Sequence, residues 1–264
     1  MSIRKAAKKK KAPTKKAARK KAPEKKTTKK AAPKKKAAPK KEKAAPKKKK
    51  AAPKKKTVVR RGDGPSWVAP FLHALPPDDV EIPDEDRLES LAERVPEPLM
   101  DAWRSVGWGR FGKGFVVLVD PEELEDVLDE WLGGPSSTRV PLGRTALGDL
   151  LYFRDLRERA RQLGFTGDVA DNACDVNVVD VRYKRVSRLS TSVPEFFSTV
   201  LGDPNELEAT MRKDLFDAAL PRLGPPDRNE MYGFVPALAL GGSENPESLQ
   251  RVRAREHLSL LFQL

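Results

Sequence analysis

The sequence predicts an α+β fold: a compact region of mixed helices and short strands that follows a disordered, basic N-terminal tail. Two observations predict it. Residues 1–61 hold 30 Lys and Arg against two Glu, a net charge of +28, whereas residues 62–264 carry −14 and all 17 aromatic residues. In the second part, helical spacing and β-branched runs follow one another without the regular strand–helix–strand order of a parallel sheet.

The tail has nothing with which to build a core. From Ala31 onward it repeats two alanines, a proline and a lysine block. Proline withholds a backbone donor and the lysines repel one another, so we expect disorder. The composition resembles that of the C-terminal tails of linker histones. We therefore expect non-specific nucleic-acid contact, the alternative being a merely solubilising extension. The lysines expected to make this contact are Lys34, Lys35, Lys36, Lys47, Lys48, Lys49, Lys50, Lys54, Lys55 and Lys56.

The folded part opens with three predicted helices and a strand. Apolar residues at helical spacing predict a helix over 67–75, which Pro76 and Pro77 end. Asp84 is a plausible cap for a second helix, and a third is expected over 98–107. The apolar, β-branched run at 114–119 predicts a buried strand.

The clearest helical pattern begins at Pro121. Leu124, Val127, Leu128 and Trp131 recur at i, i+3, i+4 and i+7, and Gly133 and Gly134 follow as a stop. These residues predict one helix with an apolar face. The candidate partner-binding residues lie on its other face and are Glu122, Glu123, Asp126, Asp129 and Glu130, with a merely solvated surface as the alternative.

Further strands and helices are expected towards the C-terminus. Segments 144–147 and 150–153 flank Gly148-Asp149 and predict two strands joined by a tight turn. The remaining expectations are a helix over 155–163, a strand over 176–183 paired with the residues after Lys184, helices over 194–201 and 204–220, an edge or bent strand over 231–240 broken by Pro236, and a closing helix over 246–264.

Several functional classes are disfavoured. Cys174 is the single cysteine and His73 and His257 are the only histidines, so neither an intramolecular disulfide nor a structural zinc site is expected. No apolar stretch is long enough to span a bilayer, and no apolar run follows the basic start as in a signal peptide. We therefore expect a cytoplasmic protein without metal, cofactor or small-molecule substrate.

The candidate catalytic features have simpler interpretations. Asp168, Asp171, Asn172 and Asp175 lack the spacing of a calcium loop and are expected to form a polar loop. Glu256 and His257 are adjacent on a predicted helix and cannot face one substrate. Cys174 is expected to be inert.

The glycine-rich run 107–114 lacks the Lys-Ser/Thr ending of a phosphate-binding loop, so we interpret it as a turn with packed aromatic residues. No nucleophile, base and orienting residue can be assembled from spacing, so we do not expect an enzyme.

Several runs of the sequence resemble two known families. WRSVGWG at 103–109, DEWLG at 129–133 and RTALGDL at 144–150 are similar to the GAD-like (GAD-related) domain, which we place at 62–165. LGP at 223–225, MYGFVPALALGG at 231–242 and the last residues resemble the C-terminal domain of type VI secretion immunity proteins, placed at 190–264. The basic tail and the long segment 154–175 depart from this pattern.

The resemblance implies a bacterial protein that binds and neutralises a toxin, in the best-known branch a DNase. A DNA-cleaving toxin presents a positive cleft to phosphates, so the acidic helix face becomes the expected binding surface. The alternative is a DNA-associated protein whose tail binds and whose folded part is an adaptor. An unrecognised hydrolase is a third hypothesis. The opposite charges also predict that the tail covers the acidic surface transiently at low salt.

Overall fold

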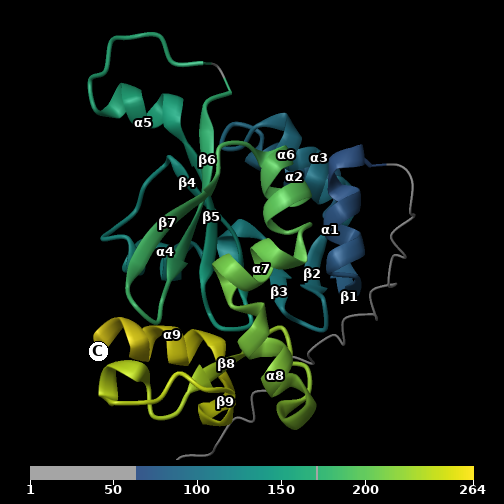
Figure 1. Ribbon diagram of the computed structural model, residues 1–264. Coiled ribbons are helices and arrows are strands. Elements are labelled where there is room, and N and C mark those ends of the chain that lie inside the picture. Colours follow the sequence, from purple (N-terminus) through teal and green to yellow (C-terminus); the bar gives the residue numbers. More distant parts are fainter. Residues whose placement is uncertain (1–63, 171) are drawn as a thin grey trace, which may run out of the picture. The chain divides into compact units, whose positions relative to one another are not determined.

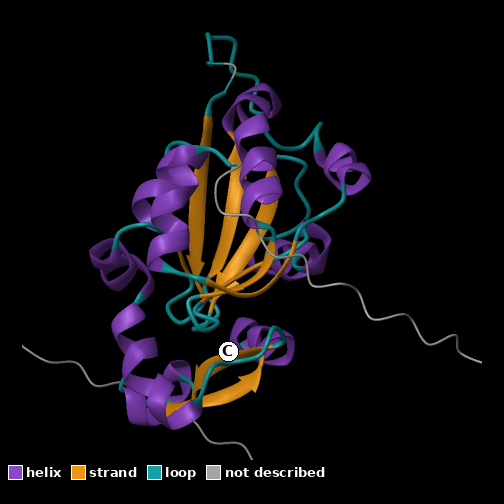
Figure 2. Ribbon diagram, turned by 90° about the vertical axis from the view of Figure 1, so that its right-hand side faces the viewer, coloured by secondary structure: helices purple, strands orange, loops and turns teal. Residues whose placement is uncertain are grey.

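The computed structural model describes residues 64–170 and 172–264; the basic tail and the prediction of its disorder lie outside the described residues. Seven strands form one antiparallel sheet (Figure 1), and their spatial order is the order of the sequence. They are β1 (Pro77–Glu81), β2 (Trp108–Phe111), β3 (Val116–Leu118), β4 (Arg139–Thr145), β5 (Leu150–Asp155), β6 (Cys174–Asp180) and β7 (Arg185–Ser190). A separate two-stranded sheet pairs β8 (Glu230–Phe234) with β9 (Leu249–Arg253), as Figure 2 shows.

Helices connect and cover the strands. The α-helices are α1 (Ala69–Ala74), α2 (Glu85–Leu91), α3 (Glu97–Val106), α4 (Glu125–Trp131), α5 (Leu156–Gln162), α6 (Val193–Glu195), α7 (Pro204–Met211), α8 (Lys213–Leu223) and α9 (Ala254–Gln263). Short 3-10 turns occupy Ser66–Val68, Pro121–Glu123, Leu238–Leu240 and Pro246–Ser248, and a π-turn spans Phe196–Val200. The expected α+β class is thereby confirmed.

Each face of the seven-stranded sheet has its own core. On β5, Leu151 and Phe153 belong to the larger cluster, which includes residues of α1, α3, α7 and α8. Leu150 and Tyr152 belong to a smaller cluster with residues of α4 and α9. Because successive strand residues point to opposite faces, β5 supplies both cores, and α4 and α9 share one side of the sheet.

Glycine is required where β4 passes β3. The β4–β5 register shifts between Pro141 and Gly143, and Gly143 has a φ of +157°. A Cβ at Gly143 would lie 2.1 Å from the carbonyl oxygen of Val117. The two backbones therefore meet at a distance that only glycine allows.

Many expected elements are confirmed. The β4–β5 hairpin turns at Gly148-Asp149, β6 pairs with β7, and α5 ends before Gly164. The segment 204–220 contains two helices instead of one, because Arg212 takes a left-handed conformation with φ 54°.

Three other expectations need correction. The helix expected from Pro121 is divided by Leu124, whose φ of −122° separates a 3-10 turn from α4. The closing helix begins only at Ala254, because residues 249–253 form β9. The run 107–114, expected to be a turn, contains β2 before its turn.

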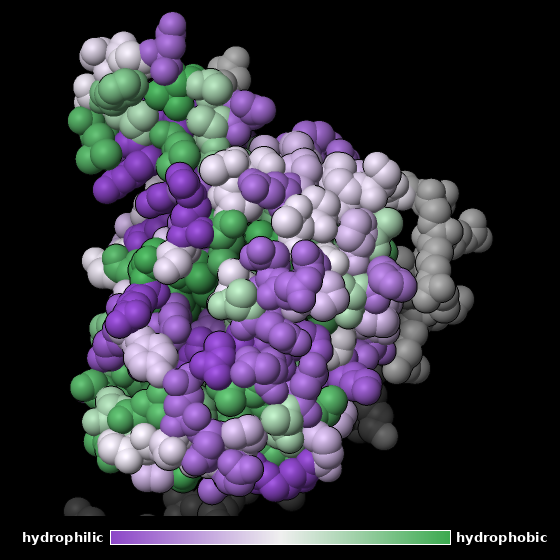
Figure 3. Space-filling model, in the orientation of Figure 1, coloured by the Kyte–Doolittle hydropathy of each residue, from purple (hydrophilic) through white to green (hydrophobic). Residues whose placement is uncertain are grey.

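The segment around α5 projects beyond the end of the sheet (Figure 1). None of the residues of α5 is buried, and apolar residues gather on this projection in Figure 3. Leu163 and Phe165 are 67% and 58% exposed.

Candidate functional site

The candidate acidic face begins at a capped turn and continues along α4. The Asp120 carboxylate accepts a hydrogen bond from the Glu122 amide at 3.1 Å, which starts the 3-10 turn before α4. Val127 and Leu128 are then buried in the smaller core. Burial of this apolar side fixes the helix on the sheet and leaves the acidic residues on the outside.

Arginines from other parts of the chain pair with most of these carboxylates. Glu122 lies 2.9 Å from Arg87, and Asp129 lies 3.7 Å from Arg139. The remaining pairs are Glu123 with Arg228, Asp126 with Arg255, and the neighbouring Glu125 with Arg94. The acidic face is therefore held in a network of opposite charges.

The most exposed of these pairs, those of Glu122 and Asp126, are weak. The side chains of Glu122 and Asp126 are 68% and 65% exposed, and ion pairs in such surroundings contribute only ~0–1 kcal/mol each. The hydrogen bond from Arg255 lowers the pKa of Asp126, whereas burial raises the pKa of Asp129. Glu130 is exposed and makes no ion pair within residues 64–170 and 172–264. Glu130 is therefore a carboxylate immediately open to a partner.

A buried arginine lies behind this face. Arg144 of β4 is 2% exposed and donates hydrogen bonds to the backbone carbonyls of Thr145, Arg228 and Glu230. Burial and the like charge of Arg228 lower the pKa of Arg144 to about 10. The guanidinium thus joins the large sheet to the segment that leads into β8.

The β4–β5 turn holds a buried carboxyl. Thr145 Oγ1 donates to Asp149 Oδ2 at 3.0 Å and accepts hydrogen bonds from the amides of Leu147 and Asp149. Arg182 lies 3.4 Å from Asp149, yet burial dominates and raises the pKa of this carboxyl to about 6. Asp149 thereby titrates well above the range of an ordinary aspartate.

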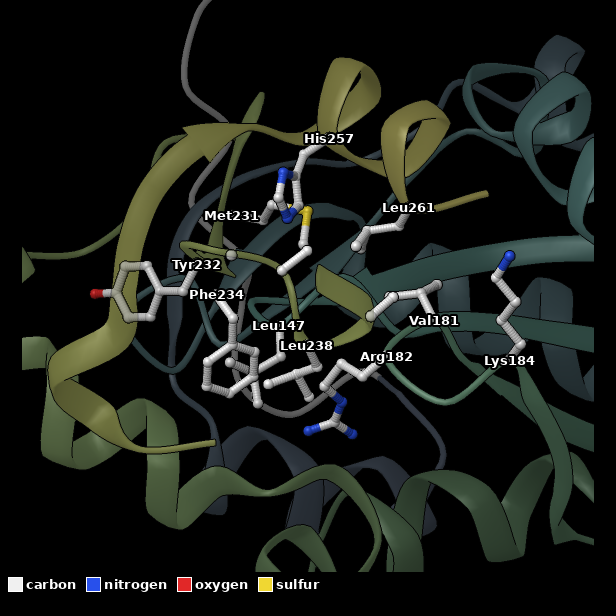
Figure 4. Close-up of a pocket in the computed structure, with 13 residues that line it drawn as sticks. Leu147, Val181, Arg182, Lys184, Met231, Tyr232, Phe234, Leu238, His257 and Leu261 are labelled. Carbon is white, nitrogen blue, oxygen red and sulfur yellow. The ribbon is translucent and has the colours of Figure 1, made fainter. Parts of the chain in front are cut away.

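A small cavity lies between the β6–β7 turn and the C-terminal elements (Figure 4). Leu147, Val181 and Arg182 line one side, and Met231 and His257 belong to the other. Its volume is about 30 Å³, which corresponds to one or two water molecules. This cavity has no room for a substrate.

The other candidate residues do not come together. Asp175 is buried and pairs with Arg154 and Asn177, whereas Asp168 lies in an exposed loop and Asp171 lies outside the described residues. Glu256 is exposed and His257 is buried, so they face different surroundings, as expected.

Cys174 is buried at the start of β6, and burial raises the pKa of its thiol. Within residues 64–170 and 172–264, no group of three or more His, Cys, Asp or Glu is placed to hold a metal ion. In the same part of the chain, no helix is long and apolar enough to cross a membrane.

Two family models match the chain. The GAD-like domain matches residues 67–163, and the model described as T6SS immunity protein Tdi1, C-terminal, matches residues 190–264. The two matches support the architecture of a GAD-like region followed by an immunity-protein region, and the second supports an immunity role. No curated protein matches the sequence.

The fold is similar to a solved structure, the crystal structure of Atu4351 from Agrobacterium tumefaciens. The similarity has a TM-score of 0.52 and 17% sequence identity and covers 74% of this chain and 88% of that chain. At this identity the similarity concerns the fold.

The residues that sequence reasoning missed are the arginines around the acidic face. One of them, Arg255, follows two other arginines at alternate positions, Arg251 and Arg253, which lie in β9. This alternation is typical of a strand with one charged face and would have indicated β9.

Proposed function

We propose that this chain is an immunity protein that neutralises a toxin by binding it and performs no chemical reaction itself. The match of residues 190–264 to the C-terminal domain of a type VI secretion immunity protein carries the proposal. An inhibitor of this kind needs a stable surface complementary to its target rather than an active site. The buried core on both sides of the sheet supplies such a support.

The binding surface in this proposal is the acidic face of α4 and its preceding turn: Glu122, Glu123, Asp126, Asp129 and Glu130. A DNA-cleaving toxin must attract phosphates with positive charge, and an anionic surface competes for the same cleft. The paired carboxylates favour this use because lysines or arginines of the toxin can replace Arg228 and Arg255 at little cost. Glu130 makes the first contact, because it has no ion pair with an arginine of the described residues that would have to break.

The test is association with the toxin encoded beside this chain, measured with purified proteins. The wild-type chain is expected to bind and to protect cells in co-expression. Glu130→Lys should slow association roughly two- to fivefold at low ionic strength and leave the unfolding temperature unchanged.

Glu208→Lys is the matched control, because Glu208 is an exposed acid on α7, a helix of the other face of the sheet. If both variants associate equally fast, the binding surface lies elsewhere. If the wild-type chain does not bind, the immunity role itself is wrong.

We also propose that the basic tail contacts nucleic acid without sequence preference and keeps the inhibitor where a DNase acts. The net charge of +28 in residues 1–61 supports this role, with the repeated lysine blocks from Lys34 to Lys56 as contacts. Deleting residues 1–61 should abolish binding to random duplex DNA at low salt. Equal binding with and without the tail would contradict the proposal.

Deleting residues 1–61 also distinguishes the immunity role from the alternative function, that of a DNA-associated protein. A DNA-associated protein with an adaptor domain would lose its binding to DNA when the tail is deleted. An immunity protein without the tail would keep its affinity for the toxin. A toxin affinity that increases at low salt after deletion would show that the tail competes for the acidic face.

A further inference from the structure

We propose that a second site, which borders the acidic face and shares Glu123 with it, binds the phosphate group of a small phosphorylated molecule. The site is a cavity of about 380 Å³ between the turn before α4 and the β9–α9 junction. Its charged lining consists of Arg144, Arg228, Arg253, Arg255, Glu123 and Glu256. The sequence predicts no small-molecule substrate, and a bound phosphorylated molecule departs from that prediction.

Positive charge exceeds negative charge in this cavity. Four arginines line it against two glutamates, Glu123 and Glu256. Arg228 and Arg255 are engaged by Glu123 and Asp126, but Arg253 makes no ion pair within the described part of the chain. The surplus favours an anion over a neutral or cationic ligand.

The deepest of the four arginines has no acidic partner among the described residues. Arg144 satisfies its donors with backbone carbonyls, and its pKa is lowered by burial and by Arg228 without an opposing carboxylate. A buried charge of this kind is unfavourable unless it meets an opposite charge. An anion in the cavity would supply that charge.

The start of α9 adds a second, separate attraction for an anion. This helix has ten residues, and no side chain caps its N-terminus at Arg253. The first amide, of Ala254, donates to the carbonyl of Asn229, and the next residues of the helix, Arg255 and Glu256, line the cavity. Free amides and the helix dipole at such a start attract phosphate groups.

The remaining lining defines the rest of the ligand. Val119, Leu124 and Leu258 give the cavity an apolar side, and its volume exceeds that of a phosphate ion. The planar guanidinium of arginine binds two oxygens of a phosphate group through its paired donors. A phosphomonoester with a small apolar or aromatic group therefore fits better than inorganic phosphate.

The experiment measures binding of inorganic phosphate and of phenyl phosphate to the full chain. Thermal unfolding is followed at constant ionic strength, with chloride as the reference anion, because a ligand of the native state raises the unfolding temperature. Phenyl phosphate is expected to stabilise the wild-type chain more than phosphate does. The tail is present in every variant, so its own contribution cancels.

Substitutions at two exposed residues of the cavity should change the affinity for phenyl phosphate in opposite directions. Arg253→Gln should weaken phenyl phosphate binding roughly tenfold, because it removes a charge-assisted contact. Glu256→Gln should strengthen binding, because it removes a carboxylate that repels the ligand.

The matched control is Arg188→Gln on β7, which removes the same charge outside the cavity and should leave binding unchanged. Equal weakening by Arg188→Gln and Arg253→Gln would overturn the site, as would the absence of any stabilisation by phenyl phosphate beyond that of chloride. Amide chemical shifts of Arg255 and Glu256 provide a second readout, and shifts that do not move on titration would also overturn it.

Discussion

Replacing Gly143 by alanine is expected to lower the free energy of unfolding by about 3 kcal/mol or more. The new Cβ would lie 2.1 Å from the Val117 carbonyl oxygen and 3.0 Å from the Leu118 Cα atom. Both atoms belong to the backbone of β3, which pairs with β2 on its other side and is buried. The sheet would have to separate at its centre, and urea unfolding monitored by circular dichroism measures the loss.

Gly133→Ala is the matched control for this variant. Gly133 also has a positive φ, +80°, but no atom lies within 4 Å of the position that its Cβ would take. Gly133→Ala should therefore lower the free energy of unfolding only through the strained backbone conformation, by about 1 kcal/mol. If the two variants lose the same stability, contact with β3 is not the reason that Gly143 is required.

The second large effect is a pH dependence of stability that comes from Asp149. Its pKa is about 6 in the folded protein, against an ordinary value of 3.8, because burial disfavours the charged carboxylate. Between pH 4 and 6 the unfolded chain has released this proton and the folded chain retains it. The contribution of Asp149 is therefore fully present below pH 4 and is lost as the pH rises to 6, by about 3 kcal/mol.

Asp149→Asn removes this contribution, and urea unfolding of both proteins between pH 4 and 7 measures it. The pKa values of Asp126, Asp214 and Glu230 are lowered in the folded protein. Their contributions to the stability of the fold are therefore lost as the pH falls, opposite to that of Asp149. Both proteins share those groups, so the difference between their curves isolates Asp149. Parallel curves would show that Asp149 does not titrate in this range.

The parts of the fold that the sequence predicts are those with local causes. The β4–β5 hairpin follows from two apolar runs around Gly148-Asp149, and α4 follows from its apolar spacing. The sequence does not predict β1, because residues 77–81 include a proline and three acids and form an exposed edge strand. The residues of β9 fit a helix as well, because Leu249 and Val252 have helical spacing; pairing with β8 decides the outcome.

The candidate site also contains features with local causes and features that depend on residues far apart in the sequence. The places of Asp126, Asp129 and Glu130 follow from helical spacing within α4, whereas Glu122 and Glu123 lie in a 3-10 turn that the spacing does not predict. The ion pairs Glu123–Arg228 and Asp126–Arg255 join residues 105 and 129 positions apart. No local pattern identifies such partners, and the arginine-lined cavity that they border was therefore not predicted.

Hydrogen bonds from Arg144 connect the seven-stranded sheet to the start of β8. Their acceptors lie at Arg228 and Glu230, and the Tyr232 amide donates to Ala146 close by. Both hydrophobic clusters also contain residues from each family-model region. We therefore expect the two regions that match separate family models to unfold in one cooperative transition, and we expect neither region to keep its native form after the chain is cut between them.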